Sequence, residues 1–190
     1  MKKGKIIILS APSGCGKSTI IAEVIKDTAL KLEFSISATN REPRRGETDG
    51  VNYYFLSTED FKKAIESDSL VEYEEVYPGR FYGTLKSEIA RICADGNNAI
   101  LDIDVKGALN VKKLYGDDAL ALFIMPPSID TLRHRLLSRG TETVDAINQR
   151  VGKAEYEISF ASQFDRTVVN DVLIDAINET HDIIAEFINK

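Results

Sequence analysis

The sequence has few of the features that mark an exported, membrane-bound or nucleic-acid-binding protein. Its only cysteines are Cys15 and Cys93, so we expect no disulfide framework, and a reducing, cytoplasmic environment fits. No apolar stretch has the length that a membrane span needs, and the apolar run after the basic N-terminus, residues 6–9, is too short for a signal peptide. The net charge of −6 argues against general nucleic-acid binding, which needs a basic surface. We therefore expect a cytoplasmic protein without nucleic-acid or membrane partners.

The chain of 190 residues fits one domain, 1–190, that is large enough for a true hydrophobic core. Hydrophobic residues make up 43% of it and charged residues 28%, which is typical of a globular protein. Because the whole chain is acidic, any phosphate site must be made by local clusters of basic residues.

A strand, a glycine-containing loop and a helix follow one another from residue 6, in the stretch IIILSAPSGCGKS. This order of strand, glycine-containing loop and helix predicts a phosphate loop. Gly14 and Gly16 let successive backbone N–H groups turn inward towards an anion, and the positive end of the new helix adds to that field. Lys17 can then reach the β- and γ-phosphates of a nucleotide, and the hydroxyl of Ser18 can bind Mg²⁺. The alternative is an ordinary glycine-rich turn, which the Gly-Lys-Ser sequence disfavours.

Besides its two glycines, this loop contains Ala11 and Cys15. Ala11 stands where the pattern G-x-x-x-x-G-K-[ST] has its first glycine, which suits a turn that needs no positive φ there. Cys15 lies where a helix N-terminus could lower the pKa of its thiol. A small residue tolerated at a variable position is the simpler interpretation of Cys15.

A second anion site is predicted directly after a short strand at 34–37. The following segment, 38–47, contains a proline and three arginines within five residues, Arg41, Arg44 and Arg45. Pro43 disfavours helix before it, so the arginines lie on extended or turning backbone. Their planar guanidinium groups match phosphate oxygens, although a solvated charged loop is the alternative.

The stretch 34–84 predicts a small, partly antiparallel lobe inserted into the α/β core. Strands are expected at 53–56 and 70–77, with a helix between them that begins at the capping box headed by Ser57. Thr84 is expected to cap the helix that follows the turn at 79–83.

The core resumes at an apolar strand, 99–104, that ends in carboxylates. Asp102 and Asp104, two residues apart, share one face, and ligands gather at the carboxyl ends of parallel strands. A strand at 166–170 and a terminal amphipathic helix complete the core. We assign to this core the ranges 1–33, 98–128 and 160–190.

A helical lid is predicted at about 135–150. The helix capped by Ser128 carries Arg135 and Arg139 one turn apart, the segment 140–143 breaks it, and the next helix carries Arg150. Arginines on a solvated helix face are the alternative.

Two anion sites, one of them a phosphate loop, suggest phosphoryl transfer between two bound phosphates. Such catalysis is mostly positioning and charge neutralisation, and an acceptor that is already an ionised phosphate needs no general base. This fits the two histidines, His134 and His181, which both lie on predicted helices. A GTPase is disfavoured because no Asn-Lys-x-Asp motif occurs.

With these motifs in place, the sequence resembles the guanylate kinase family over nearly its whole length. The stretches that carry the resemblance are SAPSGCGKST, SATNREPRRGETDGVNYYF, VEYEEVYPGRFYGT, ILDIDVKGA, RHRLLSRGTET and VVND. Together they are far more specific than the phosphate loop alone. Ala11 and Lys106 depart from the family pattern, but neither replaces a required group.

The resemblance implies a P-loop three-layer α/β/α fold with a central parallel sheet, an inserted GMP-binding lobe and a helical lid. It implies transfer of the γ-phosphate of ATP to GMP, with Mg²⁺ as cofactor, and leaves open dGMP as a substrate and a monomer or a homodimer as the assembly. ATP is expected to contact Ala11, Pro12, Ser13, Gly14, Cys15, Gly16, Lys17, Ser18, Thr19 and Asn170, the last near adenine. The GMP phosphate is expected to contact Ser37, Arg41, Arg44, Tyr53 and Tyr82, and guanine to contact Glu72, Thr84 and Asp104. The catalytic residues are expected to be Lys17, Arg135, Arg139 and Arg150, with Ser18 on Mg²⁺ and Asp102 next to the waters of the ion.

Two other interpretations remain at this point. One is a scaffold domain of the same fold that binds peptides and performs no chemistry, which loss of Lys17 or of the lid arginines would favour. The other is a kinase for a different nucleoside monophosphate, which depends on the residues that contact the base.

Overall fold

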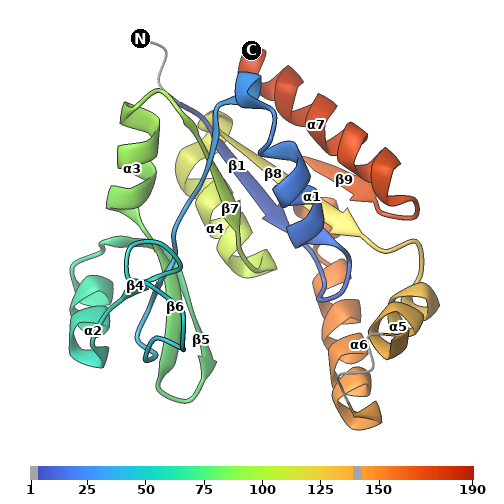
Figure 1. Cartoon of the computed structure of the whole chain (residues 1–190), viewed down its shortest axis with the longest axis horizontal. Helices are drawn as coiled ribbons and strands as arrows, with labels where there is room; N and C mark the ends of the chain where they lie inside the picture. The colour runs from blue at the N-terminus through green and yellow to red at the C-terminus, as the bar shows by residue number, and fades with distance from the viewer. Residues whose placement is uncertain (1–3, 139–142) are drawn as a thin grey trace.

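A five-stranded sheet forms the centre of the computed structural model, which describes residues 4–138 and 143–190. Most of its residues are buried isoleucine, leucine, valine and alanine, as expected for a sheet that is covered on both faces. Every neighbouring pair of strands is parallel, so the carboxyl ends of the strands lie at one end of the sheet (Figure 1). In spatial order the strands are β2 (Leu32–Phe34), β7 (Asn98–Asp102), β1 (Ile6–Ser10), β8 (Ala119–Met125) and β9 (Arg166–Val169).

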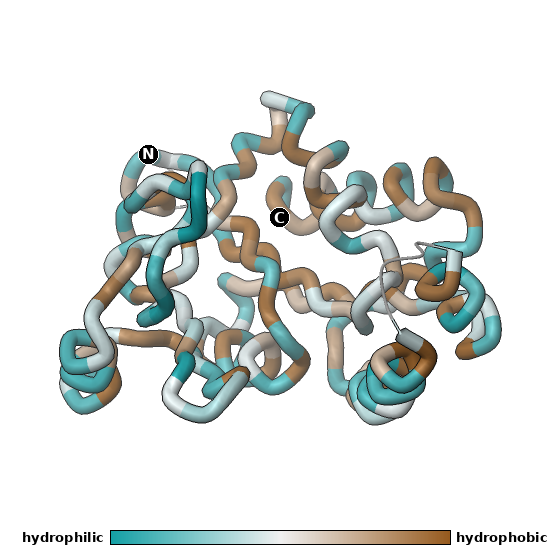
Figure 2. The backbone as a smooth tube through the Cα atoms, turned by 60° about the horizontal axis from the view of Figure 1, so that its bottom comes forward, coloured by the Kyte–Doolittle hydropathy of each residue, from teal (hydrophilic) through white to brown (hydrophobic). Residues whose placement is uncertain are grey.

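Helices cover both faces of this sheet (Figure 1). Ile7 and Leu9 of β1 face one helical layer and Ile6 and Ile8 face the other, because successive side chains of a strand alternate. The layer against Ile7 and Leu9 contains α1 (Lys17–Val24), α5 (Ile129–Ser138), α6 (Val144–Ile158) and α7 (Leu173–Asn189), and the other contains α3 (Lys86–Ala94) and α4 (Val105–Tyr115). Figure 2 shows hydrophobic residues concentrated in the middle of the molecule. The predicted three-layer α/β/α fold with a central parallel sheet is confirmed.

A second, four-stranded sheet lies beside the central one (Figure 1). Its strands, in spatial order, are β4 (Tyr54–Phe55), β3 (Ala38–Thr39), β6 (Arg80–Leu85) and β5 (Leu70–Tyr77), and helix α2 (Thr58–Glu66) packs on it. β3 and β4 are parallel, whereas the pairs of β6 with β3 and with β5 are antiparallel. Ala38, Phe61 and Leu70 form a small core of its own. The sheet is therefore partly antiparallel, as predicted.

The helices α2, α5 and α6 begin at capping hydroxyl groups, of which Ser57 and Ser128 were predicted. Ser57 accepts a hydrogen bond from the backbone N–H of Asp60 (3.0 Å) and donates one to its carboxylate (2.7 Å). Ser128 and Thr143 accept from backbone N–H groups three residues further on, at 3.0 and 3.3 Å. Short 3₁₀ helices at Thr28–Leu30, Gly116–Asp118 and Ala161–Gln163 lead into β2, β8 and β9. Within the two described ranges, no helix has both the length and the apolar character of a membrane span.

Three local predictions were wrong. The strand expected at 34–37 ends at Phe34, and residues 35–37 carry the chain from one sheet to the other. Thr84 does not cap a helix but lies within β6, because pairing with β5 extends to Leu85. The strand expected at 99–104 ends at Asp102; Asp104 instead caps α4, accepting hydrogen bonds from the N–H groups of Lys106 (2.7 Å) and Gly107 (3.1 Å).

Candidate active site

The predicted phosphate loop connects β1 to α1 at the carboxyl end of the sheet. Gly14 (φ 95°) and Gly16 (φ 84°) both have the left-handed backbone that glycine allows, and Ala11 does not need it. A Cβ atom at Gly16 would lie 2.5 Å from the amide nitrogen of Asn170, so glycine is also required by the close packing. Because α1 begins at Lys17, the first N–H groups of a helix adjoin this loop, where an anion can be bound.

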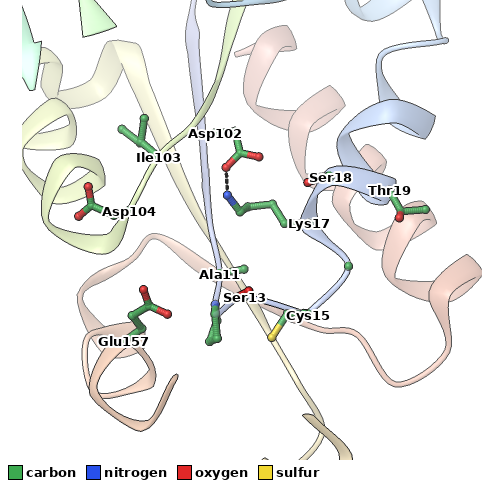
Figure 3. A pocket seen from close by; sticks show the side chains of 13 residues that line it. Ala11, Ser13, Cys15, Lys17, Ser18, Thr19, Asp102, Ile103, Asp104 and Glu157 are labelled. Carbon is green, nitrogen blue, oxygen red and sulfur yellow. Dashed lines mark ion pairs between the residues drawn. The ribbon is translucent and has the colours of Figure 1, made fainter. Parts of the chain in front are cut away.

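A cavity of about 420 Å³ lies in front of the loop (Figure 3). The whole loop from Ala11 to Thr19, including Pro12 and Ser13, lines it, together with Asp102, Ile103, Asp104 and Glu157. All the predicted loop contacts to ATP therefore surround one cavity.

Lys17 points into this cavity and forms an ion pair with Asp102 (Figure 3). Burial lowers the pKa of Lys17 to about 8, while the carboxylates of Glu157 and Asp104 oppose that effect. The ammonium group has lost most of its water and depends on nearby negative charge. A polyphosphate in the cavity would supply such charge in greater amount.

The loop is held from behind by Asn170, which directly follows β9. Its side-chain amide donates a hydrogen bond of 2.7 Å to the carbonyl oxygen of Cys15. Asn170 is buried and supports the loop through this hydrogen bond, while its place near adenine stays a prediction. Burial also raises the pKa of the Cys15 thiol to about 12, which fits the interpretation of Cys15 as a small packing residue.

The predicted lid arginines that the structure describes contact the loop region. Arg135 donates to the carbonyl oxygens of Asn170 (2.9 Å) and Asp171 (3.2 Å), and Arg150 donates to the hydroxyl of Ser13. Arg139 lies outside the described residues, as does most of the predicted break at 140–143. Two arginines from two helices thus approach the loop region, and Arg150 does so through Ser13, which lines the cavity.

Oxygen donors suited to Mg²⁺ line the same cavity. The hydroxyl of Ser18 and the carboxylate of Asp102 are both present there, and such hard oxygens are what Mg²⁺ prefers. In residues 4–138 and 143–190, no group of three His, Cys, Asp or Glu side chains could hold a metal ion by itself.

Arg41, around which an anion site was predicted, lies next to the second sheet and is only 9% exposed. Its guanidinium group makes two hydrogen bonds to Glu47 (2.6 and 2.7 Å) and one to the hydroxyl of Tyr82 (3.1 Å). It also lies 5.0 Å from the centre of the Tyr53 ring. Hydrogen bonds from Arg41 lower the pKa of Glu47 to about 2. Arg41, Tyr53 and Tyr82 are therefore brought together as predicted, around a carboxylate of the protein itself.

The other predicted phosphate contacts are less closely grouped. Arg44 and Arg45 are exposed on the loop that follows Arg41, and the backbone N–H of Arg44 donates to Glu47 (2.7 Å). Ser37 lies at the end of the connection between the two sheets, where its carbonyl oxygen accepts from the N–H of Tyr54.

The predicted guanine contacts form a buried polar pair next to α4. Thr84, 1% exposed, donates a hydrogen bond of 2.6 Å to Glu72, which is 8% exposed. The pKa of Glu72 is raised to about 7, mainly by burial; Asp104 and Glu74 contribute to the rise, and the hydrogen bond from Thr84 opposes it. Keeping this carboxylate charged while it is buried costs free energy. Buried groups with such shifted pKa values are concentrated at functional sites, so Glu72 and Thr84 are candidates for a polar binding site.

Sequence reasoning missed three residues that shape the site. Glu157 of α6 is buried and lines the phosphate cavity, but its sequence context is that of any glutamate on an amphipathic helix. Glu47 is the partner of Arg41. Gly107 makes room for both carboxylates, since a Cβ there would lie 3.0 Å from Glu72 and 3.3 Å from Asp104; a glycine inside a predicted helix was the available signal.

The fold and the site define a P-loop nucleotide-binding protein in which a second sheet carries a buried arginine paired with a glutamate and a buried carboxylate–hydroxyl pair. The model of the family described as Guanylate kinase matches residues 3–187. The chain belongs to the guanylate kinase family.

Relatives over the full length support this assignment. The chain is 54% identical to a guanylate kinase of Porphyromonas gingivalis, covering 98% of this chain and 99% of that protein. It is 49% identical to a guanylate kinase of Salinibacter ruber, covering both chains completely. The crystal structure of guanylate kinase from Anaplasma phagocytophilum is 27% identical, with a TM-score of 0.76, covering 100% of this chain and 89% of that one.

The raised pKa of Glu72 predicts a pH-dependent effect on stability. Below its ordinary pKa of 4.5, Glu72 is protonated in both the folded and unfolded states and has no effect. Above about 7 the folded protein carries the full cost of a buried charge, roughly 3 kcal/mol from about 2.5 pH units at 1.36 kcal/mol each. Glu72→Gln, whose amide oxygen can still accept from Thr84, should therefore gain stability relative to wild type between pH 5 and pH 8.

Urea unfolding at the two pH values, without nucleotides, measures this difference. Glu66→Gln, the same change at an exposed glutamate of α2, is the control and should show little pH-dependent gain. A Glu72→Gln variant that differs from wild type by the same free energy at pH 5 and pH 8 would contradict the raised pKa.

Proposed function

We propose that this protein transfers the γ-phosphate of ATP to GMP, giving ADP and GDP. The observation that carries the proposal is the position of Asp104. It lines the cavity that contains Lys17, and it also adjoins the buried pair of Glu72 and Thr84. The proposed donor phosphate site and the proposed base site therefore lie next to each other, with Asp104 between them.

On the donor side, the loop and Lys17 bind the polyphosphate of ATP. Lys17 exchanges its ion pair with Asp102 for contact with the β- and γ-phosphates, where it neutralises charge in the transition state. Mg²⁺ bound with ATP draws charge from the phosphates; the hydroxyl of Ser18 would hold it, with Asp102 next to its waters. Arg135, Arg139 and Arg150 are proposed to approach the transferring group as residues 135–150 close over it.

On the acceptor side, the GMP phosphate is bound by Arg41 with Tyr53 and Tyr82. The two-pronged hydrogen bonding between Arg41 and Glu47 has the geometry with which a guanidinium group binds phosphate, so Glu47 holds Arg41 in its binding orientation. Ser37 and Arg44 complete the proposed phosphate contacts.

The transfer itself needs no general base. A phosphate oxygen of GMP attacks the γ-phosphorus, the bond to the β–γ bridging oxygen breaks, and ADP leaves with that electron pair. Since the attacking oxygen is already ionised, no proton is removed from it. We place this reaction in the cytoplasm.

Guanine matches the buried polar pair, and adenine does not. The N1–H and N2–H₂ groups of guanine donate to Glu72, with Asp104 available to the amino group, and Thr84 turns its hydroxyl to O6. Adenine has an unprotonated N1 that would face the Glu72 carboxylate, a lone pair against a negative charge. Sites that leave buried polar groups unpaired by the wrong substrate can discriminate by about 10⁴-fold.

Lys17→Ala tests the donor site. Loss of the ammonium group should lower kcat by about a thousandfold, because its charge is needed when the phosphoryl group is in transit. Lys26→Ala removes an exposed lysine close to the end of the same helix and serves as the control. Activity of Lys17→Ala within about tenfold of wild type, in a folded protein, would remove Lys17 from the transition state.

Glu72→Gln tests the base site. A coupled assay of ADP release should show GMP as the preferred acceptor over AMP, UMP and dTMP. The variant should lose about a hundredfold in kcat/KM for GMP and change little for AMP, so the preference narrows. Glu74→Gln is the matched control. An unchanged ratio of GMP to AMP rates would show that Glu72 does not contact the base.

A further inference from the structure

The chain connects the central sheet and the second sheet at two places, and one side chain lies at both. Residues 35–37 lead from β2 into β3, and Leu85 leads from β6 into α3. Glu88 lies in the first turn of α3, directly after the second connection, and is only 2% exposed. Figure 1 shows α3 above the second sheet and at the side of the central one.

The carboxylate of Glu88 joins three segments that are distant in sequence. It accepts a hydrogen bond of 2.8 Å from the hydroxyl of Tyr54 in β4, and one of 3.3 Å from the backbone N–H of Ile36 in the first connection. Arg91, one turn further along α3, donates two more, both of 3.0 Å. Each oxygen of the carboxylate therefore has two partners, one from Arg91 and one from outside α3.

The side of Glu88 that faces the core is firmly fixed. Arg91 also donates to Glu33 of β2 (2.7 Å), and Ile89 and Ile92 of the same helix are buried against the central sheet. Burial raises the pKa of Glu88, but the hydrogen bonds from Arg91, Tyr54 and Ile36 outweigh it, so the pKa lies below its ordinary value. The group is a charged acceptor anchored to the core.

The side that faces the second sheet depends on Tyr54. Its strand, β4, is two residues long and lies at an edge of the sheet, where β3 is its one neighbour among the strands that the structure describes. Because side chains alternate along a strand, Tyr54 points to Glu88 while its neighbours Tyr53 and Phe55 lie against the guanidinium group of Arg41, at 5.0 and 5.5 Å from the two ring centres. The hydroxyl of Tyr54 thus ties the aromatic wall of the Arg41 site to the core.

We propose that the hydrogen bond between Tyr54 and Glu88, called the pin below, fixes the orientation of the second sheet relative to the core. It thereby keeps the proposed acceptor phosphate site ready to bind its ligand. Both are positioning residues, since neither lines the phosphate cavity. The inference rests on the proposed function, because the ligand whose binding it favours is GMP. Without the pin, the second sheet takes up more orientations, and binding GMP has to restrict them.

Tyr54→Phe and Glu88→Gln test the pin without creating a large cavity. Tyr54→Phe removes one hydroxyl, and Glu88→Gln keeps the shape while removing the charge. Each should raise KM for GMP by about three- to tenfold while KM for ATP stays within about twofold, because the described residues that line the donor cavity include none from the second sheet. The double variant should resemble the more affected single variant rather than multiply the two effects.

Tyr73→Phe is the control, since it makes the same change at an exposed tyrosine of the same sheet. Equal losses for both substrates, or no change for either, would overturn the pin. If wild-type protein transfers no phosphate to GMP, the proposed function fails instead, so the two failures can be told apart.

A distance measurement gives a readout that does not involve GMP. Spin labels attached at Glu59→Cys in α2 and Asp175→Cys in α7, both exposed positions, measure the distance between the second sheet and the core. The native Cys15 and Cys93 are buried, so they should not react with the label. Tyr54→Phe should broaden the distribution of distances and Tyr73→Phe should not. A distribution that is the same in all three proteins would contradict the pin even if KM for GMP changed.

Discussion

The ammonium group of Lys17 is the charge around which this site is arranged. It has been taken out of water, so it must be paired, and Asp102 is its partner. Pairing is possible because β1 and β7 are parallel neighbours in which Leu9 stands beside Asp102, so the loop after one strand meets the last residue of the other. The order of strands in the central sheet therefore determines the electrostatics of the phosphate site.

The acceptor half follows the same physical rule. Arg41 is held by Glu47, and Glu72 is held by Thr84, as Lys17 is held by Asp102. Each of these three charged groups has a partner in the free protein, and under the proposed function each partner matches the chemistry of a substrate group that would bind there. The protein thereby avoids unpaired buried charge and keeps its binding groups oriented.

Features that depend only on residues close together in the chain could be predicted from the sequence. The loop after β1 was predictable because Gly14, Gly16 and Lys17 act within one turn of backbone, and the cap at Ser57 was predictable for the same reason. Asp104 was predicted to end a strand, but it caps α4 instead. In that position its carboxylate accepts hydrogen bonds from two backbone N–H groups of the helix, which would not be available if the strand continued. Glu157 and Glu88 could not be predicted as site or junction residues. Their importance comes from what packs against them, and a glutamate on a helix carries no local sign of that.

Under the proposed function, ATP and GMP occupy adjoining sites with their phosphates in line. The most direct measurement uses one molecule in which adenosine and guanosine are joined by five phosphates, a length that spans both nucleotides. It should inhibit competitively against ATP and against GMP, and bind more tightly than either, because one association fills both sites. Competition with ATP alone, at the affinity of an ordinary adenine nucleotide, would contradict the account.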